Sequence, residues 1–304
     1  MFTLNFLLIS ISILISVAFY TLLERKILSY IQIRKGPNKV GFMGILQPFS
    51  DAIKLFNKNL ISPELSNSLI SFITPFSSML ISILIIPMIS FNSYSLFDNK
   101  HNFLLFFILS SMMVYSILLI GWSSNSKYCH LGSIRSVAQM ISYEISFFMI
   151  ILFIVLLSQS YSFTQMTESQ IMLQFFWGNM ISFMIWMTSC LAETNRSPFD
   201  FAEGESELVS GFNVEYMGGW FALIFLAEYM SMLILSMIST LIFFKTLKSF
   251  STLIMIFLST LLIWIRGSYP RFRYDMLMNL SWKTFLPISL FIIPFPSIIY
   301  MMFM

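Results

Sequence analysis

Charged residues are scarce in this sequence. Lys, Arg, Asp and Glu together make up 10% of its 304 residues, whereas about 25% is usual in soluble domains. Hydrophobic residues make up 57%, including 34 Phe and 23 Met. A soluble domain of this size needs a charged surface that this composition does not supply, so a soluble globular protein is excluded. The main solvent of the chain is lipid.

Residues that bind cofactors are also rare. Cys129 and Cys190 are far apart and form no Cys-x-x-Cys pair, which argues against iron–sulfur, structural zinc and disulfide sites. His101 and His130 both lie between hydrophobic runs, so a bis-histidine haem within the membrane is excluded. No nucleotide-binding, serine-hydrolase or zinc-protease motif occurs. We therefore expect no haem, flavin, iron–sulfur cluster, NAD or metal in this chain. Its net charge of +3, without basic runs, also argues against nucleic acid.

Eight hydrophobic runs are long enough to cross a membrane, which takes about 20 apolar residues in a helix. The predicted spans are 2–23, 69–90, 103–122, 138–160, 171–192, 216–244, 250–266 and 283–303. The first ends on Glu24-Arg25-Lys26 without a cleavage site, which indicates a retained span. The last should bend or break at its prolines, Pro287, Pro294 and Pro296. We predict an all-α bundle of about eight transmembrane helices, forming one membrane domain over residues 1–304.

Basic residues are distributed unevenly between the two sides of this bundle. Connections after the first, third, fifth and seventh spans carry 14 of the 17 Lys and Arg residues, and the other side carries Lys100, Lys245 and Lys248. Basic loops stay on the cytoplasmic or matrix side of a membrane. We therefore expect the long connections to face inward and both termini to face the outer compartment.

The first inner connection contains an amphipathic segment at residues 43–60. Apolar residues recur there at three- and four-residue spacing, at Ile45, Phe49, Ile53, Phe56 and Leu60, and the opposite side carries Asp51, Lys54 and Lys58. The pattern predicts an interfacial helix. Such a helix either rests on lipid headgroups or forms a lateral gate for a lipid-soluble ligand.

Glutamates lie in or at the ends of four spans, where an isolated carboxylate costs roughly 2.5–3.5 kcal/mol. Glu24 and Glu193 lie at inner ends, whereas Glu144 and Glu228 lie about 9 and 18 Å inside at 1.5 Å per residue. Almost no basic residue lies within the spans to neutralise them. For the three glutamates at graded depth, Glu193, Glu144 and Glu228, we favour a proton path over three unrelated packing residues. Waters, hydroxyls or the neighbouring tyrosines would bridge the steps.

Acidic residues are densest at 192–216. This segment contains one basic residue, Arg196, and six acidic residues: Glu193, Asp200, Glu203, Glu205, Glu207 and Glu215. Crowded carboxylates should share protons. The segment is too apolar for a solvated loop, because it also contains Phe199, Phe201, Leu208, Val209 and Phe212. We expect it to fold against a partner or back into the membrane.

Long blocks of this sequence resemble one family, subunit 1 of respiratory complex I (NADH:ubiquinone oxidoreductase). The matching blocks occur in family order over nearly the whole chain: Glu24-Arg25-Lys26, 32–38, Gln47-Pro48 with Asp51-Ala52 and Lys54-Leu55, 137–144, 192–216 and 269–275. One departure is Lys58-Asn59, where the family pattern has Lys-Glu. The richness in Phe and Met suggests a mitochondrially encoded animal member.

The resemblance implies a multi-pass subunit of the mitochondrial inner membrane, with both termini in the intermembrane space. It implies that the chain contributes to the proton-translocating reduction of ubiquinone without catalysing it alone. The implied partners are hydrophilic-arm and membrane-arm subunits of complex I, together with phospholipids. Two alternatives are a related hydrogenase- or antiporter-type subunit and a free-standing proton-coupled transporter, although no inverted repeat supports the latter.

The resemblance also assigns roles to residues. The implied quinone chamber and its support comprise Glu24, Arg25, Arg34, Asp51, Lys54, Arg135, Arg196, Asp200, Arg271 and Arg273. The implied proton path comprises Glu144, Glu193, Glu203, Glu205, Glu207 and Glu228.

Overall fold

The computed structural model describes residues 2–61, 63–89, 96, 99–171, 174–202, 204–244 and 248–294. Over these residues the chain forms helices joined by loops and contains no β-strand. The predicted fold class, an all-α helical membrane bundle, is confirmed.

Six helices in the described part of the chain are long and apolar enough to cross a membrane. They are α1 (Phe2–Ile31), α3 (Ser68–Ile85, continued by the 3-10 turn Ile86–Met88), α4 (Asn102–Ser123), α5 (Lys127–Ser158), α10 (Gly219–Phe243) and α11 (Lys248–Ser268). With 32 residues, α5 is about 48 Å long, which exceeds the roughly 30 Å of a hydrocarbon core. One end of α5 must therefore project beyond the lipid.

Two further segments correspond to the fifth and eighth predicted spans. In the fifth, a short α7 (Phe175–Gly178) breaks at Gly178 and Asn179, and the apolar α8 follows (Met180–Glu193). The eighth is composite, with α12 (Tyr274–Asn279), a π-helical segment (Leu280–Phe285) and α13 (Leu286–Ile292) in succession. Pro287 lies in the first turn of α13, where a missing N–H is tolerated, whereas Pro296 lies outside the described residues.

The remaining helices are short. They are α2 (Gln47–Phe56), α6 (Phe163–Ser169) and α9 (Glu205–Leu208), with 3-10 turns at Phe42–Gly44 and Gly211–Asn213. Of these, α2 carries the amphipathic pattern predicted for residues 43–60.

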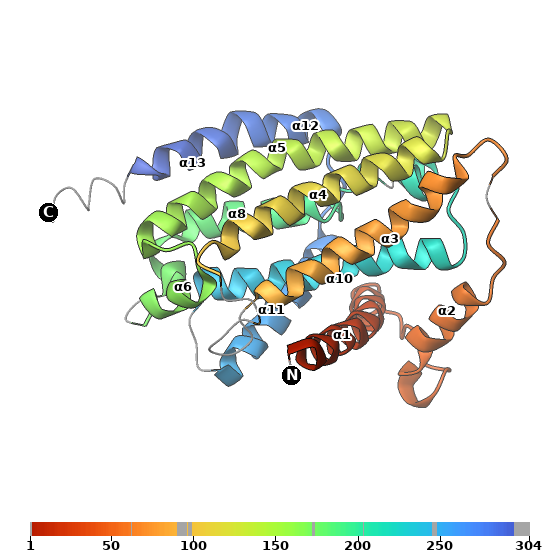
Figure 1. The fold of residues 1–304 in the computed structure, drawn as a ribbon, viewed down its shortest axis with the longest axis horizontal. Coiled ribbons are helices and arrows are strands. Elements are labelled where there is room, and N and C mark those ends of the chain that lie inside the picture. The colour runs from red at the N-terminus through yellow and green to blue at the C-terminus, as the bar shows by residue number, and fades with distance from the viewer. Residues whose placement is uncertain are drawn as a thin grey trace, which may run out of the picture.

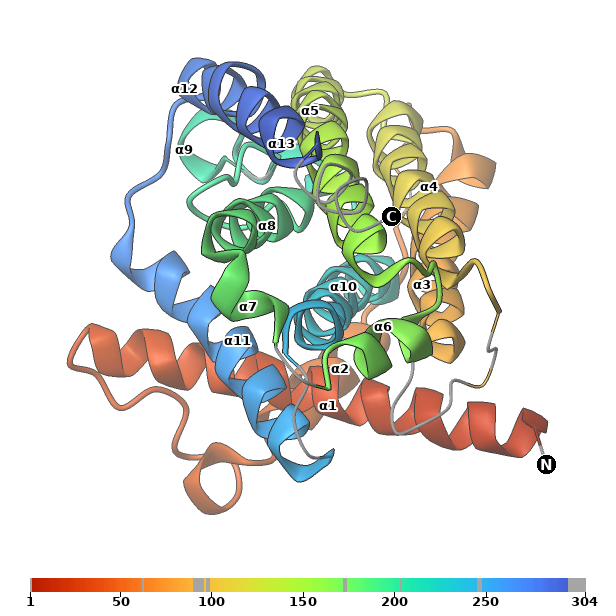
Figure 2. The same ribbon diagram turned by 90° about the vertical axis from the view of Figure 1, so that its left-hand side faces the viewer.

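The long helices form a bundle around α8. Figure 1 shows α3, α4, α5 and α10 running side by side, and Figure 2 shows α8 enclosed between α5, α10, α11 and the α12–α13 pair. Unlike these, α1 runs across the bundle and packs against α10 and α11. The start of α3, the end of α4 and the start of α10 lie together at one end of the molecule.

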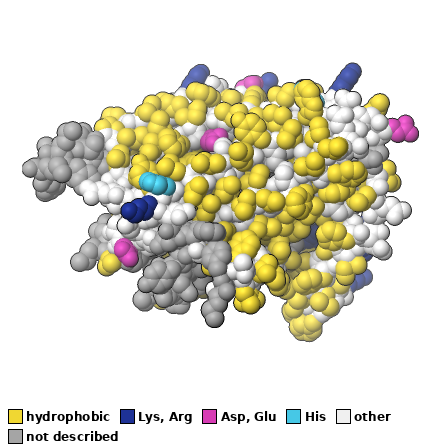
Figure 3. Space-filling model, viewed as in Figure 1, with side chains coloured by type: hydrophobic (Ala, Val, Ile, Leu, Met, Phe, Trp, Pro, Cys, Tyr) yellow, Lys and Arg dark blue, Asp and Glu magenta, His cyan; other side chains and the backbone are white. Residues whose placement is uncertain are grey.

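The outer surface is apolar. Hydrophobic side chains cover most of the face in Figure 3, and most of its charged side chains lie near the edges. On α1, the side chains of Leu4, Leu7, Leu8 and Ile11 are more than half exposed. An apolar surface of this extent indicates contact with lipid or with other membrane subunits.

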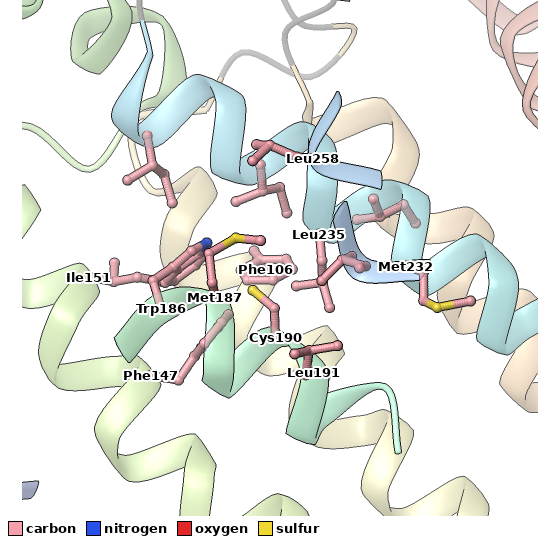
Figure 4. Close-up of a cluster of buried hydrophobic side chains, with 14 of the residues drawn as sticks. Phe106, Phe147, Ile151, Trp186, Met187, Cys190, Leu191, Met232, Leu235 and Leu258 are labelled. Atoms are coloured by element: carbon pink, nitrogen blue, oxygen red, sulfur yellow. The ribbon is translucent and has the colours of Figure 1, made fainter. Parts of the chain in front are cut away.

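The bundle interior is packed with large apolar side chains (Figure 4). Trp186 on α8 is fully buried and stacks on Phe147 of α5, with ring centroids 4.3 Å apart. Leu258 of α11 is buried in the same cluster. Cys190 is a free, buried thiol in this core, and it packs as a small apolar side chain.

The acidic segment folds over the end of the bundle instead of extending into solvent. Phe199, Phe201 and Phe212 are each at most 4% exposed. The amide of Gln139 on α5 holds the segment by donating to the carbonyls of Ala192 and Phe199, at 2.8 Å each. The Ser197–Pro198 peptide bond is cis. The projecting first turns of α5 therefore support this segment.

Candidate functional site

A buried carboxylate, Glu24, lies where α1, α10 and α11 meet. It is 5% exposed. Its Oε2 accepts a hydrogen bond from the Tyr229 phenol at 2.5 Å, and its Oε1 accepts one from the Arg266 guanidinium. A buried charge is stable only when it is paired and hydrogen-bonded. Both oxygens of Glu24 meet that condition.

Arg196 brings the acidic segment into the same site. It is 7% exposed, and its two terminal nitrogens lie 3.9 Å from Oε1 of Glu24 and 3.6 Å from Oε2 of Glu228. Its guanidinium also lies over the ring of Tyr229, 4.4 Å from the centroid. We call Glu24, Arg196, Glu228, Tyr229 and Arg266 the charge network. Two carboxylates balance two guanidinium groups in it.

The charge network shows where basic partners for the membrane glutamates come from. The predicted spans contain almost no basic residue, and the partners of Glu24 and Glu228 come from a connection and from the end of a helix. Arg196 lies in the acidic loop by sequence, but its side chain is buried between these two glutamates. Arg266 was assigned only to an inner connection. In the structure it lies in the last turn of α11, beside Glu24.

Tyr20 supports the network from α1. Its hydroxyl donates to the carbonyl of Ser259 on α11 at 3.0 Å, and its ring meets the Tyr229 ring edge-on at 6.0 Å. Sequence reasoning missed Tyr20 and the role of Arg266. The available signal was that Glu24 and Arg266 both lie at the inner ends of predicted spans.

Two cavities connect the other membrane glutamates. The first, about 300 Å³ including its open mouth, is lined by Ser110, Val114, Met140, Tyr143, Glu144, Phe147, Ser189 and Glu193. The second, about 430 Å³ on the same basis, is lined by Glu193, Glu228 and polar groups that include Ser116, Thr194, Asn195 and Ser231. Glu193 lines both cavities. The acids therefore follow one another as Glu144, Glu193 and Glu228, and Glu228 meets Arg196.

The estimated depths placed a step of about 9 Å between Glu193 and Glu144, and both side chains line one cavity. Hydroxyl groups were expected to bridge the glutamates, and serines line both cavities. The second cavity is polar and large enough to hold water.

The predicted loop residues are partly brought together. Arg135 of α5 pairs with Glu207 at 2.5 Å. Arg271 lies over the ring of Phe201, 5.3 Å from its centroid, and Asp200 is half-buried. Glu205 begins α9. Glu203 lies outside the described residues.

The residues expected near a quinone entrance lie beside α2. Arg25 pairs with Asp51 at 2.6 Å, and Gln47 donates to the other oxygen of Asp51 at 2.9 Å. Arg34 and Lys54 are exposed and join no ion pair within the described residues. Arg273 is exposed and pairs with Asp275 at 3.2 Å, away from this group.

The apolar side chains of α2 remain uncovered. Phe49, Ile53 and Phe56 are 41–68% exposed, and Phe49 touches Phe19 of α1 edge-on at 5.9 Å. The helix α2 packs on both α1 and α10. This position suits both a headgroup-level helix and a lateral gate. Within the described residues, no cluster of three or more His, Cys, Asp and Glu side chains could hold a metal ion.

Comparison with known proteins gives one consistent relationship. The family model described as NADH dehydrogenase matches residues 4–296. NADH-ubiquinone oxidoreductase chain 1 of Aedes aegypti is 51% identical over 299 residues, covering 93% of this chain and 91% of the relative. The chain 1 proteins of Locusta migratoria and Balaenoptera physalus are 50% and 46% identical, each covering 95% of this chain and 93% and 94% of the relative.

Proposed function

The chain belongs to the NADH dehydrogenase family, and on that basis we propose that it forms the ubiquinone entrance and the start of the proton path in NADH:ubiquinone oxidoreductase. It is a core membrane subunit of that assembly and crosses the inner membrane several times. The transporter alternative is not favoured, because relatives that match 93% or more of this chain are named as oxidoreductase subunits.

Several finer features belong to the proposal. The hydrophilic-arm quinone module and membrane-arm subunits are the neighbouring partners, and phospholipids cover the remaining apolar surface. Both termini face the intermembrane space, because most of the basic residues lie in the opposite connections. Ubiquinone is the substrate shared with the other subunits.

The observation that carries the proposal is the continuity between α2 and the glutamate series. Arg25 and Glu24 are neighbours on α1, and adjacent helical residues point about 100° apart. Arg25 pairs with Asp51 beside the apolar face of α2, whereas Glu24 is buried in the charge network. One turn of α1 therefore connects the candidate quinone entrance with the buried charges.

The proposed roles are those that the resemblance to the family implies. The chamber and its support comprise Glu24, Arg25, Arg34, Asp51, Lys54, Arg135, Arg196, Asp200, Arg271 and Arg273. The proton path comprises Glu144, Glu193, Glu203, Glu205, Glu207 and Glu228. Arg196 belongs to both sets in effect, because it contacts Glu24 and Glu228 together.

The coupling step uses the charges of this chain. Reduction of a quinone to a quinol takes up two electrons and two protons near the chamber. Uptake of those electrons draws the Arg196 guanidinium toward the chamber and loosens its contact with Glu228, because opposite charges attract strongly where water is excluded. A proton can then move between Glu228 and Glu193 through the second cavity, and between Glu193 and Glu144 through the first.

The test is a Glu228→Gln variant of the intact assembly. Glutamine keeps the shape but cannot carry a proton. We expect the assembly to migrate on a native gel as the wild type does and to oxidise NADH, while the number of protons pumped per electron falls. Glu64→Gln, at an exposed acid outside the glutamate series, should pump normally. An unchanged ratio in Glu228→Gln would remove Glu228 from the path, whereas migration as a small particle without NADH oxidation would overturn the assignment to the oxidoreductase.

A further inference from the structure

A third cavity opens at the end of the bundle where α3 and α10 begin. It measures about 370 Å³ including its mouth. Its lining comprises Leu60, Ile61, Pro63, Ser66, Ser71, Phe72, Ser124, Glu215, Tyr216, Met217 and Trp220. None of these residues lines the two cavities of the glutamate series. The proposed proton path therefore does not use this cavity.

Glu215 gives the cavity an uncompensated negative charge. Its side chain is half-buried, and it has neither an ion-pair nor a hydrogen-bond partner among the described residues. A half-buried carboxylate without a partner is costly, so a cation in the cavity would stabilise it.

Aromatic rings line the same cavity. Trp220 and Phe72 pack against each other with centroids 5.2 Å apart, and the buried Nε1 of Trp220 has no hydrogen-bond partner. The hydroxyl of Tyr216 already contacts Ser123 at 2.7 Å, so this residue offers the cavity its ring. Aromatic rings beside a carboxylate are the usual surroundings of a bound ammonium group.

The cavity also adjoins the beginning of α3. Ser66 and Ser71 line it and lie on either side of the helix start, and the side chain of the N-cap residue Asn67 makes no capping hydrogen bond. The first N–H groups of a helix, together with its dipole, attract anions such as phosphate. A site for a cation and a site for an anion are therefore adjacent.

Below the cavity, an apolar stripe runs along α3. Its members recur at three- and four-residue spacing and are 41–70% exposed: Leu69, Phe72, Ile73, Phe76, Leu80 and Leu84. From Leu69 to Leu84 the stripe is about 22 Å long at 1.5 Å per residue. One leaflet contributes about 15 Å of hydrocarbon, so the stripe can lie along the whole length of an acyl chain.

We propose that this cavity binds the headgroup of a zwitterionic phospholipid. The ammonium group lies between Glu215 and the rings of Phe72 and Trp220, the phosphate lies at the start of α3, and the acyl chains lie along the stripe. A lysine from a neighbouring subunit would match Glu215 alone and would leave the helix start and the stripe without a ligand. The inference does not depend on the proposed roles in quinone and proton chemistry.

The test uses the intact assembly in nanodiscs that contain phosphatidylcholine with a photoactivatable diazirine on an acyl chain. After illumination, the labelled peptides are mapped by mass spectrometry. We expect labelling within residues 69–84, and about a tenfold decrease in Glu215→Gln, as for the loss of one charge-assisted contact. In-gel NADH oxidation verifies that each variant assembles.

Two controls test whether a zwitterionic lipid occupies this cavity. Glu64→Gln changes the charge of an exposed acid outside the cavity and should label as the wild type does. Phosphatidylglycerol with the same diazirine lacks the ammonium group and should label the stripe weakly. Equal labelling by the two lipids, or unchanged labelling in Glu215→Gln, would overturn the proposal. So would zero-length carbodiimide coupling of Glu215 to a lysine of a neighbouring subunit, because the occupant would then be a protein side chain.

Discussion

The phenol of Tyr229 donates a hydrogen bond to Glu24 at 2.5 Å, although 205 positions of sequence separate the two residues. The same tyrosine ring lies beneath the guanidinium of Arg196. Tyr229 therefore acts twice, as a donor to a buried anion and as a platform for a buried cation. Its position holds α1, α10 and the acidic segment in one arrangement.

Replacing Tyr229 with Phe removes the donor but keeps the platform. Hydrogen bonds to charged groups contribute about 1.5–3 kcal/mol, so we expect the free energy of unfolding to fall by about that amount. Tyr229→Leu also removes the ring under Arg196 and should cost more. Denaturant titration of the purified assembly measures both variants. Equal stability of the wild type and Tyr229→Phe would show that the contact contributes nothing.

Arg196→Gln removes the guanidinium that contacts both Glu228 and Glu24. Breaking a buried ion pair by removing one member costs about 3–5 kcal/mol. We expect little of this variant in assembled particles on a native gel. Arg196→Lys should recover part of the loss, because lysine keeps the charge but stacks poorly on Tyr229. Arg273→Gln breaks an exposed pair with Asp275, typically worth about 0–1 kcal/mol, and should assemble normally.

Glu193→Gln should interrupt the glutamate series at the one acid that lines both cavities. We expect fewer protons pumped per electron, with assembly and in-gel NADH oxidation preserved. Glu144→Gln should act in the same direction, because Glu144 lies in the first cavity. The exposed Glu64 is the matched control, and Glu64→Gln should pump normally. The measurement records proton uptake and NADH oxidation together in vesicles. An unchanged number of protons pumped per electron would contradict this prediction.

The ion pair between Arg25 and Asp51 should affect substrate access more than stability. Its side chains are 53% and 29% exposed, and such pairs contribute about 0–1 kcal/mol. If α2 forms the quinone entrance, Arg25→Asp should raise the KM for a short-chain ubiquinone, with kcat changed by no more than about twofold. The double reversal, Arg25→Asp with Asp51→Arg, should restore the KM. No change in KM would favour a helix that only rests on lipid headgroups.

Gly132 allows α5 to approach the acidic segment closely. A Cβ there would lie 3.0 Å from the backbone nitrogen of Phe212 and 3.1 Å from the carbonyl oxygen of Ala202. Because backbone atoms cannot move aside easily, Gly132→Ala should cost about 1–3 kcal/mol of stability. A Cβ at Gly178 would meet no atom within 4 Å, so Gly178→Ala should be neutral. Thermal denaturation of the assembly compares the two, and equal midpoints would contradict the close packing.

The sequence was sufficient for the helical framework because long apolar runs have few alternatives in lipid. Each predicted span overlaps a helix of the described chain, although α5 begins earlier, at Lys127. Its first turns carry Arg135 and polar residues that a hydropathy pattern does not count as membrane-embedded. They are helical because they pack against the acidic segment, which is a tertiary effect.

The partners of the buried charges could not be predicted from the sequence. Composition indicated that Glu24, Glu144 and Glu228 needed an explanation, and the apolar residues of 192–216 indicated that this segment folds. Which base reaches which acid depends on how α1 crosses the bundle and where the segment turns. Arg196 was therefore assigned to an acidic loop, whereas it pairs with carboxylates of α1 and α10.

The separation of Glu24 from its partners also affects the biosynthesis of the chain. Arg266 follows Glu24 by 242 positions, and Arg196 and Tyr229 also lie far downstream of it. A carboxylate is stable in a buried position only when it is paired and hydrogen-bonded. The buried position of Glu24 is therefore complete only once α11 has been synthesised, and we expect α1, the first helix to be made, to dock late.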